Sequence, residues 1–111
     1  MATADPQTLA TSRLLHVFDP MTQLRFLIDT GAEVSVVPAT SSDRSRPSTT
    51  NLKAANGSAI KTFGQRPLTL SLSLRRTFDW FFVVADVTTP IIGADFLSAF
   101  GLLVDPFYLA C

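Results

Sequence analysis

The sequence predicts an all-β domain of many short strands with one short helix near its C-terminal end. Short apolar segments recur along the chain, and residues 68–74 alternate strictly between leucine and a small hydroxyl residue. Turn-forming residues separate these segments, among them Asn56-Gly57, a dipeptide typical of tight hairpins. Only residues 94–100 have apolar side chains at helical spacing, and Gly101 follows them as a stop.

Local composition and turn chemistry define the individual elements. Residues 41–50 combine Ser, Thr, Arg and Pro without a large apolar residue, which predicts a surface loop. Residues 1–12 are small and polar, so we expect a flexible leader ahead of one domain that spans residues 13–111. Strands are expected at residues 14–18, 23–28, 33–37, 52–55, 59–63, 68–74, 78–85, 102–104 and 107–109, with a short buried segment at 90–93.

The charge balance and the single cysteine argue against several classes of function. Lys plus Arg number 9 and Asp plus Glu also number 9, so nothing favours binding to nucleic acid or to a membrane surface. Cys111 has no second cysteine to pair with, and with only His16 beside it we expect no metal site. No signal peptide or membrane-spanning segment is visible, which predicts an intracellular location.

The hydrophobic content is high for a chain of this size. Hydrophobic residues make up 47% of the 111 residues and charged residues 16%. A small domain has much surface to cover, so some of these apolar side chains must remain outside the core. An obligate protein partner would cover them, and we therefore expect an interface.

One tripeptide, Asp29-Thr30-Gly31, places a carboxylate directly after an apolar strand. Burying a carboxylate is costly unless a partner or a function compensates for the lost hydration. Gly31 allows a sharp bend and a close approach of another chain, and the Thr30 hydroxyl is available to hold the loop. From the tripeptide alone, a simple β-turn in which Asp29 caps its own backbone is the favoured interpretation.

The wider context changes that interpretation. Residues 26–35 (FLIDTGAEVS) resemble the active-site segment of retropepsins, the aspartic proteases of retroviruses and retrotransposons. Residues 91–97 (IIGADFL) resemble the second motif of that family, where an apolar pair and a glycine pass close to the catalytic loop and lead into the single helix. Asn56-Gly57 falls where the family places its flap hairpin, here about residues 52–63, and the second motif looks most like that of gypsy-type retrotransposons.

The resemblance implies a closed, barrel-like lobe that acts as an aspartic endopeptidase without a metal or organic cofactor. Aspartic proteolysis needs two carboxylates that share one proton and one water. Because the chain has one Asp-Thr-Gly, we expect a homodimer in which each copy supplies Asp29 at a two-fold axis. Asp29, Thr30 and Gly31 would be the catalytic residues, with Thr30 hydrogen-bonding across the axis. The terminal strands at residues 14–17 and 107–109 are the expected interface.

The resemblance also implies a substrate: a peptide in extended conformation, from the polyprotein of a retroelement, cleaved in the cytoplasm or in a virus-like particle. Backbone groups beside the catalytic aspartate and at the flap tip would bind this peptide by strand addition. Some apolar residues would line its subsites, although core packing explains each of these equally well. The expected substrate-binding residues are Ala32, Glu33, Ala55, Asn56, Gly57, Ser58 and Ile92, and Val36, Val37, Ile60 and Ile91 are further candidates for subsite walls.

Two other functions remain open at this point. A catalytically silent or domesticated domain of the same type would serve as a dimerisation or peptide-binding module, because an intact Asp29 does not establish a competent flap. A serine hydrolase would use His16 as the base for Ser12 or Ser35, but neither serine lies in a sharp nucleophile turn. The aromatic run that begins at Trp80 is interpreted as core, since no basic face accompanies it.

Overall fold

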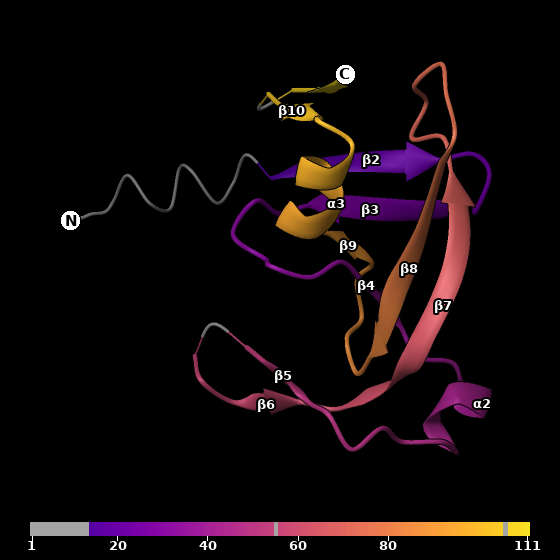
Figure 1. Cartoon of the computed structure of the whole chain (residues 1–111), viewed down its shortest axis with the longest axis vertical. Helices are drawn as coiled ribbons and strands as arrows, with labels where there is room; N and C mark the ends of the chain where they lie inside the picture. Colours follow the sequence, from indigo (N-terminus) through magenta and orange to yellow (C-terminus); the bar gives the residue numbers. More distant parts are fainter. Residues whose placement is uncertain (1–13, 55, 106) are drawn as a thin grey trace.

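A mixed six-stranded sheet forms the body of the domain, in the strand order β2-β3-β9-β4-β8-β7 (Figure 1). The computed structural model describes residues 14–54, 56–105 and 107–111, so the predicted leader lies outside the described residues. The strands of this sheet are β2 (Leu15–Asp19), β3 (Leu24–Ile28), β9 (Ile91–Ile92), β4 (Val36–Pro38), β8 (Phe78–Ala85) and β7 (Thr62–Leu70). Two small sheets pair β5 (Leu52–Lys53) with β6 (Ala59–Ile60) and β10 (Leu103–Val104) with β11 (Leu109–Ala110). The helices of the described ranges are α2 (Ser41–Arg44) and α3 (Ala94–Ala99).

The strands predicted at residues 14–18 and 23–28 are confirmed, and they form a hairpin that leads into the Asp-Thr-Gly motif. β2 and β3 pair antiparallel, with Leu15 opposite Ile28 and Asp19 opposite Leu24. β9 then pairs parallel to β3 and also contacts β4, through Val36 opposite Ile91. The C-terminal motif therefore lies between the two strands that flank the Asp29 turn in the sequence. The prediction of a mostly β domain with a short C-terminal helix is likewise confirmed.

The six-stranded sheet does not close into a barrel within the described residues, and in this respect the prediction is wrong. Its two edges are β2 and β7. β7 ends at Leu70, because Leu72 and Ser73 adopt left-handed backbone conformations with φ of 53° and 60°. The strand predicted at residues 68–74 therefore turns away before it can pair with β2.

A buried carboxylate joins these two edges instead. Asp19 is fully buried at the end of β2. Its Oδ1 accepts the backbone N–H groups of Ser71 at 2.7 Å and Leu72 at 2.9 Å, directly after β7. Its Oδ2 accepts the N–H of Thr22 at 2.7 Å and the Thr22 hydroxyl at 2.6 Å. Burial raises the pKa of the Asp19 carboxyl, but these hydrogen bonds outweigh burial and hold the pKa below its ordinary value.

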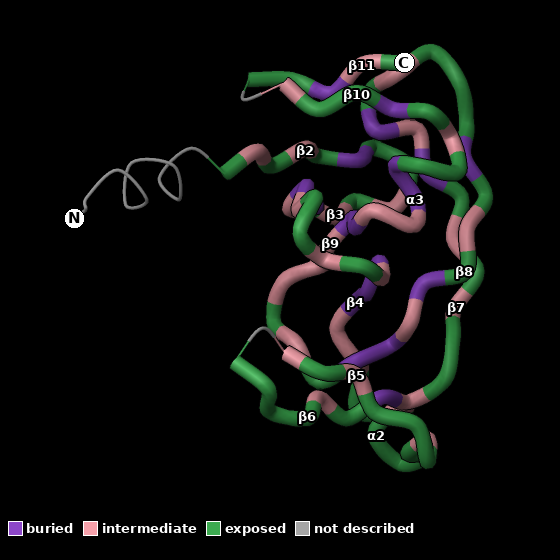
Figure 2. The backbone as a smooth tube through the Cα atoms, turned by 60° about the vertical axis from the view of Figure 1, so that its left-hand side comes forward, coloured by how far each residue is buried: buried purple, intermediate pink, exposed green. Residues whose placement is uncertain are grey.

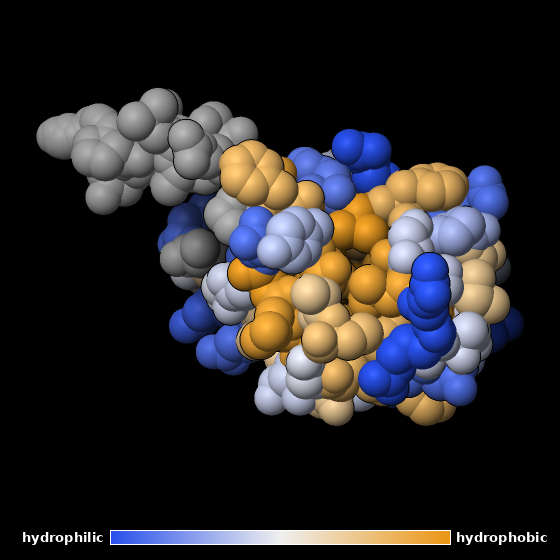
Figure 3. Space-filling model, turned by 90° about the horizontal axis from the view of Figure 1, so that it is seen from above, coloured by the Kyte–Doolittle hydropathy of each residue, from blue (hydrophilic) through white to orange (hydrophobic). Residues whose placement is uncertain are grey.

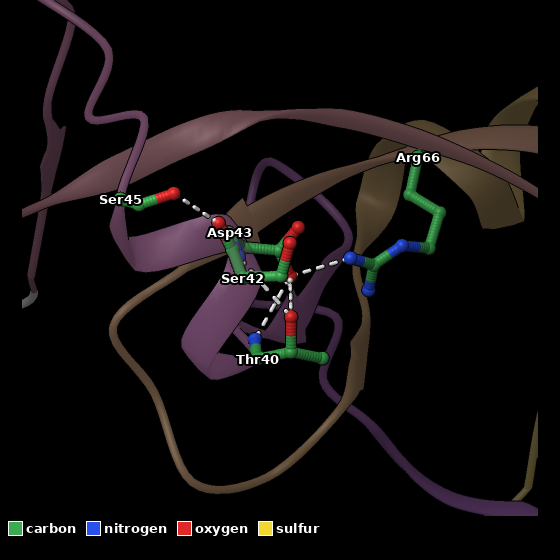
Figure 4. Close-up of polar contacts among 5 residues, drawn as sticks. All are labelled: Thr40, Ser42, Asp43, Ser45 and Arg66. Atoms are coloured by element: carbon green, nitrogen blue, oxygen red, sulfur yellow. Dashed lines mark hydrogen bonds and ion pairs between the residues drawn. The ribbon is translucent and has the colours of Figure 1, made fainter.

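A single turn of helix, α2, replaces part of the surface loop predicted at residues 41–50 (Figure 4). Thr40 and Asp43 form a reciprocal cap: the Thr40 hydroxyl accepts the Asp43 N–H, and the Asp43 carboxylate accepts the Thr40 N–H at 2.8 Å. Arg66 on β7 donates to the same carboxylate at 2.5 Å, which is the main reason that the pKa of Asp43 is lowered to about 2. The helix is thus attached to the long strand β7.

The hydrophobic core lies between α3 and the central strands, where Figure 2 shows the buried segments gathered. Phe82 of β8 packs between Phe26 of β3 and Phe96 of α3, with ring centroids 5.5 Å and 6.1 Å apart. All three side chains are fully buried, and each such burial contributes roughly 1.5–3 kcal/mol. This packing fixes α3, and with it the start of the helix beside the Asp29 turn.

We predict that Asp19→Asn lowers the free energy of unfolding by about 1–3 kcal/mol at neutral pH, because the new amide group opposes the Thr22 donors. The folded-state pKa lies below the ordinary value of 3.8, so this carboxylate stabilises the fold above that value and its contribution is lost as the pH falls. Urea unfolding between pH 2 and pH 7 measures both effects. The exposed Asp79 provides the matched control, and equal losses in Asp19→Asn and Asp79→Asn would contradict the role of Asp19.

Candidate active site

The Asp-Thr-Gly motif forms a tight turn at the end of β3. The N–H of Asp29 donates to the carbonyl of Ile92 at 2.9 Å, which continues the pairing of β3 with β9. Asp29 Oδ1 accepts the N–H of Gly31 at 3.0 Å, and the Asp29 carbonyl accepts the N–H of Ala32 at 3.1 Å. Asp29 is half-buried, while Thr30 and Gly31 are exposed. Asp29 therefore caps its own turn, and within the described residues its Oδ2 accepts no hydrogen bond.

Gly93 packs against this turn more closely than any other residue type could. A Cβ atom placed on Gly93 would lie 2.6 Å from the carbonyl oxygen of Ala32 and 3.0 Å from the carbonyl of Val34. The next residue, Ala94, donates its N–H to the same Ala32 oxygen at 2.7 Å. The start of α3 thus holds the turn from beneath through backbone atoms, and the glycine makes this approach sterically possible.

A second set of contacts joins the far end of the turn to α3 through side chains. Ser35 is fully buried, and its hydroxyl donates to Asp95 Oδ1 at 2.7 Å. Asp95 Oδ2 accepts the N–H of Ser35 at 3.1 Å and the indole N–H of Trp80 at 3.3 Å. The Ser35 hydroxyl also accepts the N–H of Gly93 at 2.9 Å. Asp95 therefore binds Ser35 and Trp80 and does not cap its own helix.

The geometry argues against Ser35 as the nucleophile of a serine hydrolase. Ser35 is committed to Asp95 and Gly93, and no hydrogen bond among the described residues joins it to His16. His16 lies on β2, opposite Leu27, with its side chain exposed. Ser12 lies outside the described residues.

The flap-like hairpin is formed by β5 and β6, with Leu52 opposite Ile60. At its tip, Asn56 Oδ1 accepts the N–H of Ser58 at 3.0 Å and the Ser58 hydroxyl at 2.7 Å. Gly57 adopts φ of 88°, which explains the glycine at this position. Ala55, also expected at the tip, lies outside the described residues. Figure 1 shows the hairpin projecting on the same side of the molecule as the turn after β3.

The remaining predicted substrate residues fall into two groups. Glu33 is exposed and Ala32 half-buried, and both follow directly after the Asp-Thr-Gly turn. Ile92, in contrast, has no exposed surface and belongs to the core. Core packing therefore accounts for Ile92, whereas its neighbour Ile91 is partly exposed.

The C-terminal residues form an exposed apolar hairpin. β10 pairs with β11, and Asp105 and Tyr108 exchange backbone hydrogen bonds of 2.9 Å and 3.3 Å across the turn. The side chains of Leu103, Phe107 and Tyr108 are 68%, 78% and 58% exposed. Figure 3 looks down on this end of the molecule and shows hydrophobic side chains gathered there. The closing strands were predicted, but not that they pair with each other.

Two residues of this site were missed or misinterpreted from the sequence. Ser35 was considered only as a nucleophile, and Trp80 only as core. The motif that contains Asp95 carried a signal, because a carboxylate inside a buried segment needs donors. Which residues donate hydrogen bonds to Asp95 depends on the fold, and the spacing of residues in the sequence does not reveal them.

The described ranges contain neither a metal-binding cluster nor a membrane-spanning helix. No three His, Cys, Asp or Glu side chains gather there in a way that would hold a metal ion. No helix in those ranges combines the length and the apolar character needed to cross a membrane.

Comparison with models of protein families identifies the family of this chain. The family model described as retroviral aspartyl protease matches residues 11–105. The chain belongs to the retroviral aspartyl protease family. The matched span includes both the turn at Asp29 and the Gly93 segment that supports it. A search of curated proteins found no match.

Solved structures show the same retropepsin fold. EIAV protease, in complex with the inhibitor HBY-793, aligns with a TM-score of 0.61 at 28% identity, covering 83% of this chain and 90% of that one. The retroviral protease-like domain of Ddi1 from Leishmania major also aligns with a TM-score of 0.61, at 20% identity, covering 83% of this chain and 81% of that one. The second likeness concerns the fold alone.

We predict that Gly93→Ala destabilises this retropepsin-type domain by roughly 1–3 kcal/mol, since its Cβ would displace the Ala32 backbone. Gly101→Ala is the matched control, because a Cβ there meets open space and only the φ of 62° opposes it, at about 1 kcal/mol. Thermal unfolding of the two variants measures the difference. An effect of Gly93→Ala no larger than that of Gly101→Ala would show that the close approach does not constrain the turn.

Proposed function

We propose that this chain is an aspartic endopeptidase whose active site forms across a homodimer. The position of Asp29 carries the proposal: a half-buried carboxylate in a turn held by backbone atoms of Ile92 and Ala94. Membership of the retroviral aspartyl protease family supports it. One oxygen of Asp29 caps the turn, which leaves Oδ2 to meet a water and a second carboxylate.

The proposed chemistry needs two such carboxylates. Two Asp29 side chains near a two-fold axis repel each other when both are charged, so one stays protonated while the other is ionised. The ionised carboxylate takes a proton from a water, which attacks the scissile carbonyl carbon. The protonated carboxyl donates its proton to the carbonyl oxygen, giving a tetrahedral intermediate without a covalent bond to the enzyme.

We place the dimer interface on the C-terminal hairpin. Leu103, Phe107 and Tyr108 offer an apolar surface that the rest of the described chain leaves uncovered. Two copies related by a two-fold axis would bury the same surface on each side. Thr30 is exposed next to Asp29, where its hydroxyl is free to reach across such an axis.

The proposed substrate is a peptide in extended conformation, bound between the turn and the flap. Glu33 and residues 56–58 are exposed, and we propose that the remaining backbone groups there pair with an added strand. Ala55 and Ala32 belong to the same proposed binding surface. By its family, the substrate would be the polyprotein of a retroelement, processed within the cell or in a virus-like particle.

A second candidate is a non-catalytic module that binds peptides or dimerises. The likeness to the protease-like domain of Ddi1 shows that this fold is found in more than one kind of protein. The flap gives a reason to test for a non-catalytic module. Asn56 and Ser58 form a hydrogen bond with each other at its tip, and Gly57 is its single glycine. The two candidates differ in whether Asp29 supports turnover.

We predict that Asp29→Asn lowers peptidase activity on an unfolded protein by at least about a thousandfold at mildly acidic pH, since a neutral amide cannot activate water. The variant should still form the dimer, as shown by sedimentation. Asp79→Asn, an exposed substitution on β8, should retain activity. Equal behaviour of wild type and Asp29→Asn would exclude the protease and leave the binding module.

We predict that Phe107→Glu weakens the dimer by about tenfold or more, because a carboxylate replaces an apolar side chain at the proposed interface. Its specific activity should fall on dilution at higher concentrations than that of the wild type. Phe81→Glu is the matched control, since Phe81 is 63% exposed on β8, away from the hairpin. Sedimentation equilibrium measures both variants, and the same dissociation constant for the two would refute this interface.

A further inference from the structure

The only tryptophan of the chain, Trp80, is connected by a continuous set of hydrogen bonds to Gly93, the residue that packs against the Asp29 turn. Its indole N–H donates to Asp95 Oδ2 at 3.3 Å. Asp95 accepts both the hydroxyl and the N–H of Ser35, at 2.7 Å and 3.1 Å. The Ser35 hydroxyl accepts the N–H of Gly93 at 2.9 Å, and Gly93 is the residue that packs beneath the turn.

The donors around Asp95 explain why the indole matters. In the described part of the chain, no Lys, Arg or His forms an ion pair with this carboxylate. Its partners there are the two donors of Ser35 and the indole of Trp80. Each hydrogen bond from a neutral donor adds to the free energy that holds a partly buried carboxylate in one orientation. Without the indole, Oδ2 would keep only the Ser35 N–H.

Aromatic packing holds the indole in place. Trp80 meets Phe96 and Phe100 edge to face, with centroid distances of 5.8 Å and 5.7 Å and interplanar angles of 79° and 67°. Both partners lie on or directly after α3, the helix that also carries Asp95. The ring therefore cannot turn its N–H away from the carboxylate without losing these contacts.

We propose that Trp80 is a positioning residue for the proposed protease: its indole N–H orients Asp95, which through Ser35 and Gly93 holds the turn that carries Asp29. This rests on the proposed function, but the positioning itself is a property of the fold. It predicts that loss of the N–H loosens the turn and lowers kcat more than KM. If Trp80 only filled the core, its removal would act through stability alone.

The test compares Trp80→Phe with Leu74→Ala. Trp80→Phe removes the N–H and keeps an aromatic ring between Phe96 and Phe100. Leu74→Ala removes partly buried packing against the same core without touching the hydrogen bonds to Asp95. Urea unfolding first places the two variants on one stability scale, and each is then studied as the full chain under conditions in which it is folded.

The first readout is amide hydrogen exchange at Asp29 and Ala94. The Asp29 N–H joins the turn to Ile92, and the Ala94 N–H joins the start of α3 to Ala32 in the turn. Exchange at these amides should be about three- to tenfold faster in Trp80→Phe than in Leu74→Ala at equal global stability. The second readout is kinetic: Trp80→Phe should lower kcat by about three- to tenfold with KM nearly unchanged. In an Asp95→Asn background, Trp80→Phe should add little to either effect.

The outcomes separate this proposal from the proposed function. Equal exchange at Asp29 and Ala94 in the two matched variants overturns the positioning role of Trp80, whatever the activity. Faster exchange in Trp80→Phe together with an inactive wild type supports the positioning role and refutes the protease. Faster exchange with kcat equal to that of Leu74→Ala overturns the link from the turn to catalysis.

Discussion

The close approach of Gly93 to Ala32 is the constraint on which the rest of the site depends. A backbone can come this near only where no side chain intervenes, and a Cβ would lie 2.6 Å from the Ala32 oxygen. The contact lets Ala94 donate to the turn and lets Gly93 donate to Ser35. It therefore joins helix α3, the turn at Asp29 and the buried Ser35 into one unit. The aromatic core matters to the site chiefly because it fixes α3 against this contact.

Much of this arrangement could be predicted from local sequence patterns. Apolar patterns and turn residues located the strands β2 and β3, and the run at residues 78–85 is a strand of the same bounds. The local pattern at Asp29 favoured a simple β-turn, and Asp29 was identified as catalytic only through the resemblance of residues 26–35 and 91–97 to retropepsin motifs. The hairpin around Asn56-Gly57 was predicted from a local signal, a dipeptide typical of tight hairpins, and Gly57 indeed adopts a φ of 88°.

What escaped prediction depends on contacts between distant residues or on conformations that the residue type does not reveal. The alternation of residues 68–74 suggested a longer strand, but Leu72 and Ser73 take left-handed conformations that their side chains do not favour. The sheet consequently stays open, and Asp19 bridges its edges. Helix α2 was missed because Asp43 occupies the capping position where Glu or Gln is more usual and no apolar residue marks its inner face.

The distance along the chain between the paired residues determines how late during synthesis the contacts around Asp29 can form. Ser35 and Asp95 are 60 positions apart, and the N–H of Asp29 has its hydrogen-bond partner in the similarly distant Ile92. Closing so long a loop is slow relative to forming a hairpin. At a synthesis rate of about 5–20 residues per second, roughly 3–12 s pass between the translation of Ser35 and that of Asp95. In the nascent chain, Asp29 therefore lies in a turn that lacks its supporting contacts, and the proposed active site can form only after Ile92 and Asp95 have been translated.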